Sequence, residues 1–340
     1  MQLLEAQNVT KVFGSGLLSK RRLAAVDEIS LAINEERPTV TAIAGESGSG
    51  KTTLARLLLG VLQPTSGSIR FRGQELAKMN SQERKEFRRQ VQAIFQDPFE
   101  VYNPVYKIDQ VLTTPVHKFK LAASKEEAQQ RIEESLRMAG LRPEDTLGRY
   151  PHQLSGGQRQ RIMVARALLL NPRVILADEP VSMVDASLRA TILESLMKLN
   201  RELGISLLYI THDLTTAYQI SDNIYILYRG SVAEVGSVEK VIKDPQHPYT
   251  RLLVNSIPLP DPDIRWGQDS AVERRTTPGA VAEVGNGCKF ASRCPFVMAE
   301  CREQAPPLYQ TDNQRAVACY LFKDQGAAVS GATIAATLNG

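Results

Sequence analysis

The sequence of 340 residues lacks the features that mark several large classes of protein. It contains no run of about 18 apolar residues, so no segment is expected to span a bilayer by itself. Residues 1–5 show neither the basic nor the apolar stretch of a secretory signal, which predicts that the protein stays in the cytosol. The formal net charge of +4 is too small for a chain of this length to indicate nucleic-acid binding.

Cysteine is missing from residues 1–287, and the four cysteines gather near the end of the chain, at Cys288, Cys294, Cys301 and Cys319. Four thiolates can hold a 4Fe–4S cluster or a tetrahedral Zn²⁺, although none of these spacings is the C-x2-C pair typical of structural zinc. Free thiols in a small lobe are the alternative. Disulfides are disfavoured because thiols in the cytosol are normally reduced.

Short β-rich segments and helical segments alternate along the first 245 residues. We expect strands at 3–9, 29–33, 40–43, 174–177 and 206–210. Helical spacing of apolar residues begins at Lys51, and further helices are expected at 125–138, 155–170 and 186–203. The alternation predicts an α/β fold, with a mainly parallel sheet covered by helices on both faces.

The composition changes near residue 245, where prolines become frequent and helical periodicity fades. We therefore place a first domain at 1–248, with a helical subdomain at about 97–171, and a C-terminal extension that holds the cysteines at 249–325. Residues 326–340 are rich in Gly, Ala, Ser and Thr, and we expect a disordered tail there.

Residues 45–52, Gly-Glu-Ser-Gly-Ser-Gly-Lys-Thr, match the pattern G-x-x-x-x-G-K-[ST] between an expected strand and an expected helix. Glycines let the backbone curl so that successive N–H groups face one centre, and the helix N-terminus adds positive potential there. Lys51 can reach the β- and γ-phosphates of a nucleotide, and the Thr52 hydroxyl can ligate Mg²⁺. A Gly-rich turn that matches by chance is disfavoured by the strand–loop–helix context.

The expected strand at 174–177 is followed by two carboxylates, Asp178 and Glu179. In an open α/β sheet, ligands bind beside the carboxyl ends of the strands. Asp178 can hold Mg²⁺ through water, and Glu179 can polarise a water molecule that attacks the γ-phosphate. Acidic residues that merely solubilise a strand end are the alternative, which the neighbouring phosphate loop makes less attractive.

A second candidate anion site lies at residues 154–158, Leu-Ser-Gly-Gly-Gln, before another expected helix. Ser155 is a natural N-cap, and the two glycines leave backbone N–H groups open to a phosphate. An ordinary capped helix is the alternative. One nucleotide has a single γ-phosphate, so two such sites in one chain suggest a dimer in which Ser155 of one copy covers the nucleotide on the Lys51 loop of the other.

The phosphate loop, the Leu-Ser-Gly-Gly-Gln segment and the strand ending in Asp-Glu resemble the ATPases of ABC transporters over residues 1 to about 250. The resemblance implies a P-loop NTPase core and assigns adenine stacking to Phe13. It assigns contacts with Mg²⁺ and the attacking water to Gln96, a role across the dimer to Asp185, and the γ-phosphate to His212. Met183 and Val184 before Asp185 depart mildly from the family pattern.

The resemblance implies a complete set of site residues. The catalytic residues are Glu179, His212 and Gln96, and the Mg²⁺ ligands are Thr52, Gln96 and Asp178. The ATP-binding residues are Phe13, Gly45, Ser47, Gly48, Gly50, Lys51, Thr52, Thr53, Ser155, Gly156, Gly157, Gln158 and Asp185.

Residues 96–112 and 247–253 resemble the oligopeptide/dipeptide importer ATPases more narrowly, except that Glu, Val and Tyr at 100–102 replace the usual small polar residues. Some members of that family carry an iron–sulfur cluster at the position of these cysteines. The resemblance implies peptides as cargo, with oligosaccharides and nickel as alternatives. An exporter ATPase and a soluble ABC ATPase are less favoured, since the chain has no coiled-coil insertion and no second cassette.

The resemblance also implies partners. They are integral membrane permease subunits, a second identical or homologous ATPase and, indirectly, an extracytoplasmic solute-binding protein. The chain would then lie at the cytoplasmic face of the inner membrane as a peripheral subunit.

Overall fold

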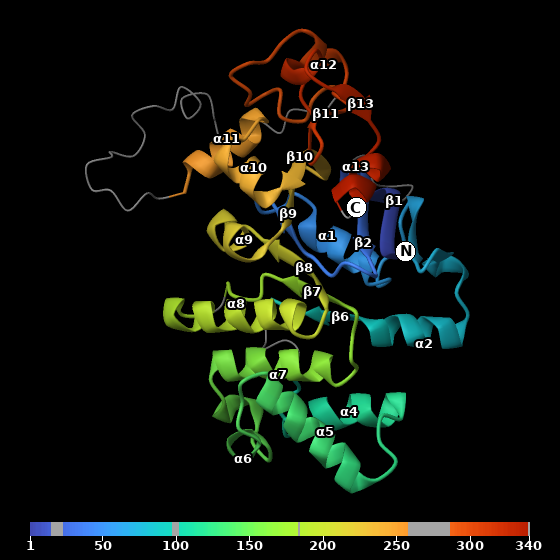
Figure 1. Cartoon of the computed structure of the whole chain (residues 1–340), viewed down its shortest axis with the longest axis vertical. Coiled ribbons are helices and arrows are strands. Elements are labelled where there is room, and N and C mark those ends of the chain that lie inside the picture. Colours follow the sequence, from blue (N-terminus) through green and yellow to red (C-terminus); the bar gives the residue numbers. More distant parts are fainter. Residues whose placement is uncertain (15–22, 97–101, 183, 258–285, 339–340) are drawn as a thin grey trace, which may run out of the picture. The chain divides into compact units, whose positions relative to one another are not determined.

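The computed structural model describes residues 1–14, 23–96, 102–182, 184–257 and 286–338. The chain forms two compact units, each made of segments that are distant in the sequence (Figure 1). Unit 1 consists of residues 1, 35–40 and 74–210, and unit 2 consists of residues 2–34, 41–73 and 211–340. None of the helices in the described ranges is long and apolar enough to cross a membrane.

Unit 2 holds an antiparallel sheet in the order β2-β1-β4. The strands are β1 (Gln2–Phe13), β2 (Leu23–Asn34) and β4 (Ser66–Phe71). Ala6 of β1 lies opposite Leu31 of β2 on one side and Ile69 of β4 on the other. All three side chains are buried, so this register places an apolar face of the sheet against the interior.

A second sheet of unit 2 has the order β13-β11-β12-β10-β9-β3. Its strands are β3 (Val40–Ala44), β9 (Asn223–Tyr228), β10 (Ser231–Ser237), β11 (Leu308–Asp312), β12 (Arg315–Val317) and β13 (Ala327–Val329). Strands β3 and β9 are parallel, and the other pairs are antiparallel. The helices of this unit are α1 (Lys51–Leu58), α9 (Leu214–Ile220), α10 (Val238–Lys243), α11 (Pro248–Asn255), α12 (Glu300–Glu303) and α13 (Gly331–Leu338).

An aromatic group lies in the core of unit 2. Tyr228, Tyr249 and Phe290 pack together with ring centroids 4.6 to 5.6 Å apart. They belong to the same buried cluster as Ala42 and Ala44 of β3, the strand that precedes the phosphate loop. The C-terminal segment therefore packs into the core behind that loop. The expected domain boundary at 248/249 falls inside this unit and stays a prediction.

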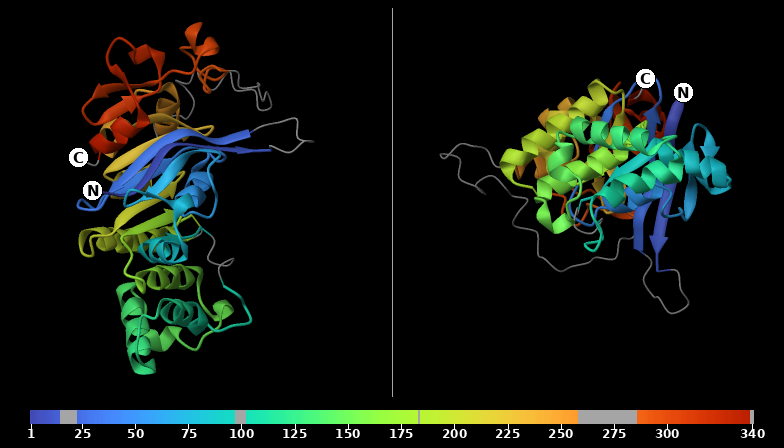
Figure 2. Two further views of the ribbon diagram at one scale, coloured as in Figure 1. Left: turned by 90° about the vertical axis from the view of Figure 1, so that its right-hand side faces the viewer. Right: turned by 90° about the horizontal axis from the view of Figure 1, so that it is seen from below.

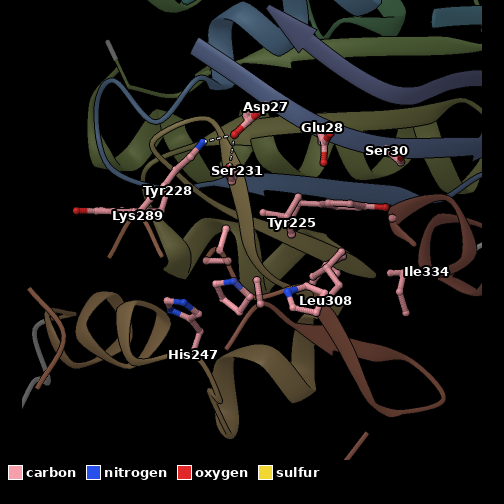
Figure 3. Close-up of a pocket in the computed structure, with 18 of the residues that line it drawn as sticks. Asp27, Glu28, Ser30, Tyr225, Tyr228, Ser231, His247, Lys289, Leu308 and Ile334 are labelled. Atoms are coloured by element: carbon pink, nitrogen blue, oxygen red, sulfur yellow. Dashed lines mark hydrogen bonds and ion pairs between the residues drawn. The ribbon is translucent and has the colours of Figure 1, made fainter. Parts of the chain in front are cut away.

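The last described residues are ordered, so the expectation of a disordered tail at 326–340 was wrong for residues 327–338. They form β13, which pairs with β11, and α13, whose Ile334 and Ala335 are buried. A Cβ on Gly331 would lie only 3.1 Å from Cβ of Ser30 in β2, so the small residues that suggested disorder allow close packing instead. Ser30 and Ile334 both line the cavity in Figure 3.

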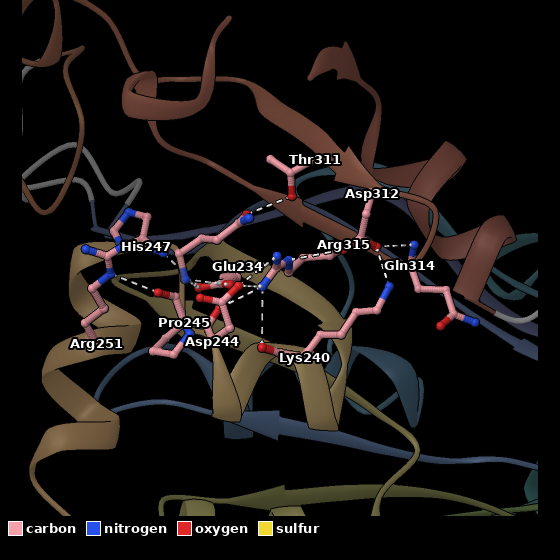
Figure 4. A network of polar contacts seen from close by, with 11 residues as sticks. Glu234, Lys240, Asp244, Pro245, His247, Arg251, Thr311, Asp312, Gln314 and Arg315 are labelled. Atoms are coloured by element: carbon pink, nitrogen blue, oxygen red, sulfur yellow. Dashed lines mark hydrogen bonds and ion pairs between the residues drawn. The ribbon is translucent and has the colours of Figure 1, made fainter. Parts of the chain in front are cut away.

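A polar network joins β10 to β12 and β11 (Figure 4). The fully buried carboxylate of Glu234 accepts hydrogen bonds from the backbone N–H groups of Gln246 and His247. Arg315 donates to the carbonyl of Asp244 at 2.7 Å and pairs with its carboxylate at 3.2 Å. Burial raises the pKa of Glu234, and the positive charge of Arg315 opposes this effect.

Unit 1 contains the parallel strands β6 (Val91–Ile94), β7 (Val174–Asp178) and β8 (Ser206–Thr211), in that order. The apolar runs of β7 and β8 are continuous, as is typical of parallel strands covered on both faces, whereas β6 contains the polar Gln92. The unit also contains β5 (Gln74–Glu75) and the helices α2 (Ser81–Gln90), α4 (Asp109–Phe119), α5 (Lys125–Met138), α6 (Pro143–Thr146), α7 (Gly156–Leu168) and α8 (Ala186–Arg201).

Helices α4, α5 and α7 gather into one bundle within unit 1 (Figure 2). Helix α5 has the predicted bounds, with the Ser124 hydroxyl capping its first turn. Gly140 follows it at φ 72°, a left-handed conformation that glycine adopts readily after a helix. These helices lie within the expected helical subdomain at about 97–171, whose exact bounds remain a prediction.

Candidate functional site

The glycine loop between β3 and α1 belongs to unit 2 and has the curled backbone that the motif predicts. Gly45, Gly48 and Gly50 have φ values of 151°, 80° and 102°. A Cβ on Gly45 would lie 2.2 Å from the Leu227 carbonyl, and one on Gly50 would lie 2.2 Å from the Ala25 carbonyl. Both positions therefore require glycine for space as well as for conformation.

Lys51 fills the concave side of this loop. Its side chain is buried at 6% exposure, and its ammonium donates to the carbonyls of Gly45 at 2.7 Å and Glu46 at 3.0 Å. Gly50, the N-cap of α1, has no side chain that can accept from the first N–H groups of the helix. Ser47, Gly48 and Thr52 are exposed here, and Thr53 is half-buried. The loop thus presents a cation, hydroxyls and a helix N-terminus to an anion.

Unit 1 carries the two carboxylates at the end of β7. Asp178 is the last residue of the strand, and Glu179 has a left-handed backbone at φ 45°. The Glu179 N–H donates to the Ile210 carbonyl at 2.8 Å, and its carbonyl accepts from the Ser182 hydroxyl at 2.9 Å. A non-glycine residue at positive φ carries strain, which these bonds hold in place.

Gln96 lies next to Glu179. The Gln96 side-chain amide donates to the Glu179 carboxylate at 3.1 Å, and both side chains belong to unit 1. Residues 97–101 of the importer-like segment at 96–112 lie outside the described residues. Tyr102 is buried, and its hydroxyl donates to the carbonyl of Arg159 in α7 at 2.6 Å. This departure from the family pattern therefore contributes an anchor for α7.

Helix α7 of unit 1 begins with the predicted cap. The Ser155 hydroxyl accepts from the Gln158 N–H at 3.2 Å, and the Gln158 side chain accepts from the Ser155 N–H at 2.9 Å. Ser155 is exposed, and a Cβ on Gly156 would have no neighbour within 4 Å. Gly157 is buried in the same first turn. The Ser155 end of α7 is therefore accessible to an outside ligand.

The remaining predicted residues lie at exposed ends of elements. Phe13 ends β1 with 42% of its surface exposed, and the Lys11 ammonium lies 5.4 Å from its ring centroid. Asp185 is the exposed N-cap of α8 in unit 1, and His212 is exposed after β8 in unit 2. Each unit thus holds part of the predicted set, and the roles of these residues stay predictions.

Sequence reasoning missed two residues that bind the glycine loop, Tyr249 and Arg293. The Glu46 N–H donates to the Tyr249 hydroxyl at 2.9 Å, and the Glu46 carboxylate pairs with Arg293 at 2.9 and 3.0 Å. Glu46 stands at a variable position of the motif, and Arg293 belongs to no recognisable motif of its own. No signal in one sequence links residues that are 247 positions apart.

The four cysteines come together around one small cavity of unit 2. All four are free thiols, and the Cys288 N–H donates to the Cys301 carbonyl at 2.8 Å. Burial, with a smaller effect from the other thiols, raises the pKa of Cys319 to about 11. Across the described part of the chain, no group of three or more His, Cys, Asp or Glu side chains is arranged to hold a metal ion.

A larger cavity of about 420 Å³ lies in unit 2 among β2, β9, β10 and the C-terminal segment (Figure 3). Of the predicted site residues in the described ranges, Cys288 alone lines it. Lys289 at its edge points to Asp27, with 2.8 Å between the ammonium and the carboxylate.

Comparison with known proteins places these features in context. The family model described as ABC transporter matches residues 26–182, and the oligopeptide/dipeptide transporter C-terminal region matches residues 233–301. YkfD of Bacillus subtilis is 38% identical over 95% of this chain and 97% of its own length. The oligopeptide transport ATP-binding protein OppF of Escherichia coli is 38% identical over 85% of each chain.

Solved structures are also similar. The ATP-binding cassette MJ0796, in a dimeric post-hydrolysis state bound to ADP and Pi, superposes with a TM-score of 0.61 at 32% identity. That match covers 69% of this chain and 99% of the cassette. The structure of cbiO1 from Clostridium perfringens, part of the ABC transporter complex cbiONQ, matches with a TM-score of 0.61 at 27% identity.

Proposed function

The chain belongs to the ATP-binding proteins of the ABC transporter family, and from that premise we propose that it hydrolyses ATP to power an importer for peptides. The predicted fold class, an α/β P-loop NTPase of the ABC ATPase type, is confirmed by the similar cassettes. The observation that carries the proposal is the glycine loop with Lys51 buried in it. The match to the oligopeptide/dipeptide C-terminal region and the names of the relatives support peptides as cargo.

Catalysis in this proposal is positioning and charge stabilisation. Lys51 exchanges the two loop carbonyls for the β- and γ-phosphates of ATP, and Phe13 stacks on the adenine. Glu179, held by Gln96, polarises the attacking water, and His212 contacts the γ-phosphate. Thr52, Gln96 and Asp178 would hold Mg²⁺, which neutralises phosphate charge when bound. The oxygen donors of these side chains suit that ion.

The second ATP contact comes from another ATPase subunit. The accessible Ser155 end of α7, with Gly156, Gly157 and Gln158, would cover the γ-phosphate on the partner's glycine loop. Asp185 would act across the same dimer. Closure of the dimer around ATP does work because the closed state binds nucleotide more tightly than the open state.

A mixing experiment on full-length chains tests both the ATPase and the dimer. Lys51→Ala and Ser155→Arg each remove one half of a composite site, so each variant alone should hydrolyse ATP far more slowly than the wild type. Their mixed dimer has one intact site, made of Lys51 from one chain and Ser155 from the other. We expect the mixture to recover hydrolysis. If the wild type does not hydrolyse ATP, the proposed ATPase function is wrong. If the mixture stays inactive, the proposal of a site shared between two chains is wrong.

The further partners are permease subunits at the cytoplasmic face of the inner membrane and, through them, an extracytoplasmic solute-binding protein. The match to the oligopeptide/dipeptide transporter C-terminal region supports this arrangement. Uptake of labelled peptides into cells that lack the chain, and into cells complemented with it, identifies the cargo. Restored uptake of oligosaccharide or nickel in place of peptide would correct the substrate and keep the motor.

We also propose that the four cysteines bind a 4Fe–4S cluster, with Zn²⁺ as the alternative. Their convergence on one cavity supports this, because clustered thiolates need a cation. Burial raises the pKa of Cys288, Cys294 and Cys319, so a bound cation would be needed to hold these three as thiolates. Anaerobic purification followed by metal analysis and visible absorbance should find about four iron atoms per chain, or about one zinc. Replacing the cysteines with serine is the control, and metal-free wild-type protein would reject the proposal.

A further inference from the structure

The segment between the first two cysteines contacts the glycine loop directly. Arg293 binds the carboxylate of Glu46 with two parallel contacts, Nη1 to Oε2 at 2.9 Å and Nη2 to Oε1 at 3.0 Å. Its guanidinium lies 5.6 Å from the ring centroid of Phe290 and 5.8 Å from that of Tyr228. The rings restrict the guanidinium, and a planar fork held in this way matches a carboxylate better than a lysine does.

Every polar group of Glu46, namely its N–H, its carbonyl and its carboxylate, forms a hydrogen bond or an ion pair. Its N–H donates to the Tyr249 hydroxyl at 2.9 Å. Its carbonyl accepts from the Lys51 ammonium at 3.0 Å and from the Ser49 N–H at 3.1 Å. With Arg293 on the carboxylate, the first turn of the loop is tied to α11 and to the cysteine segment. The shape of the loop therefore depends on residues outside the motif.

The same segment supports the other end of the loop through a turn. The Lys289 ammonium donates to the Arg229 carbonyl at 3.0 Å and pairs with Asp27 at 2.8 Å (Figure 3). The next residue of that turn, Gly230, donates its N–H to the Ser49 carbonyl at 2.9 Å. Residues 288–294 thus reach the loop at Glu46 directly and at Ser49 through Gly230.

We propose that residues 288–294 are a clamp on the phosphate loop and that Arg293 is a positioning residue for ATP binding. The clamp acts in two ways. It holds the loop in one shape before the nucleotide arrives, which lowers the entropy lost on binding. It also neutralises the Glu46 carboxylate, which would otherwise repel the phosphates. This inference rests on the proposed ATPase function.

Removing Arg293 should weaken ATP binding more than it slows the chemical step. In the full-length chain, Arg293→Ala should raise the Kd and KM for ATP about tenfold, with kcat within about twofold, because binding in the ground and transition states is lost equally. Arg293→Lys keeps the charge without the fork and should raise KM less. Arg302→Ala, an exposed arginine of the same lobe, is the matched control and should leave KM unchanged.

A double-mutant cycle tests whether Arg293 acts through Glu46. The double variant Arg293→Ala, Glu46→Gln should raise KM by a smaller factor than the product of the factors for the two single variants. The reason is that each single substitution already removes the same Arg293–Glu46 contact. If the KM of the double variant rises by the full product of the two single factors, the two residues act independently and the clamp hypothesis is wrong. It is also wrong if the KM of Arg293→Ala equals that of Arg302→Ala while its activity falls only with its folded fraction, measured by thermal melting. If Arg293→Ala does not fold, the same comparison is made with Arg293→Lys.

Failure of this inference differs from failure of the proposed function. If the wild type neither binds nor hydrolyses ATP, the proposed ATPase function is wrong. If the wild type is active and Arg293→Ala leaves the ATP affinity unchanged, only the clamp hypothesis is wrong.

Discussion

The side-chain amide of Gln96 lies 3.1 Å from the carboxylate of Glu179. The two residues follow neighbouring parallel strands, and Ile94 of β6 stands in register with Ala177 of β7. The carboxyl ends of these strands therefore bring an amide and a carboxylate together without any adjacency in the sequence. The left-handed backbone of Glu179, at φ 45°, turns the chain sharply after the strand.

Replacing the Glu179 carboxylate with an amide should stop hydrolysis and keep binding. Glu179→Gln preserves the size of the side chain but cannot polarise water, so we expect kcat to fall by about 10²–10⁴-fold. ATP affinity, measured by calorimetry, should stay within a few-fold of the wild type. Glu194→Gln, at an exposed pair with Lys198 in α8, is the control. A Glu179→Gln chain with wild-type turnover would show that another group activates the water.

The glycine at position 50 should tolerate no side chain. Gly50→Ala places a Cβ 2.2 Å from the Ala25 carbonyl at φ 102°, so the loop must shift and ATP binding should be lost. Gly73→Ala is the control for backbone strain alone, because its φ is 80° and a Cβ there meets nothing within 4 Å. In urea unfolding, we expect Gly50→Ala to cost at least about 1 kcal/mol more than Gly73→Ala. Equal costs would mean that the loop has room for a Cβ.

His247 should make the stability of the protein depend on pH. Burial lowers its pKa to about 4, although a hydrogen bond with the Ala318 backbone opposes this, and its Nδ1 accepts from the Tyr249 N–H at 3.0 Å. The neutral ring is thus required in the folded state, while the unfolded chain takes up a proton near its ordinary pKa of about 6.5. The contribution of the neutral His247 ring to the free energy of unfolding is therefore fully present above about pH 6.5. It is lost as the pH falls towards 4, by about 1.4 kcal/mol per pH unit.

The test of this dependence is the slope of the unfolding free energy between about pH 7 and about pH 5. His247→Asn keeps an acceptor at the N-cap of α11 but does not titrate, so its slope should be flatter even if the variant is less stable overall. Identical slopes for the two proteins would show that His247 is not the group responsible.

Arg315 should stabilise the buried carboxylate beside it. Arg315→Met keeps the apolar stem but leaves Glu234 without its nearby positive charge, and we expect a loss of about 2–4 kcal/mol in unfolding free energy. The loss should be larger at about pH 8 than at about pH 5. Burial raises the pKa of Glu234, so its charged form, which Arg315 stabilises, is more populated at the higher pH. Glu239→Gln, at an exposed pair with Lys243, should change stability by less than about 0.5 kcal/mol. A loss independent of pH would assign the stabilisation to packing and to the contacts of Arg315 with Asp244, and not to the charge of Glu234.

The sequence by itself determined the local features of this protein. The strand, the glycine loop and the helix after it follow one another in the chain, so spacing and residue type were enough to predict Lys51 and its surroundings. The helix at 125–138 was predicted with its observed bounds, because a helical pattern of residues is a local signal. The capped start of α7 at Ser155 is another such case.

Only the tertiary structure decided which distant residues meet. Arg293 reaches Glu46 across 247 positions, and the four cysteines share a cavity although their spacing matched no standard motif. Residues 327–338 were expected to be disordered because they are rich in Gly, Ala, Ser and Thr. Instead, β13 adds to a sheet edge and α13 packs on β2. The physical reason is the same in each case. Periodicity and propensity act within a few residues, whereas these contacts depend on the path by which the folded chain returns to its own loop and strands.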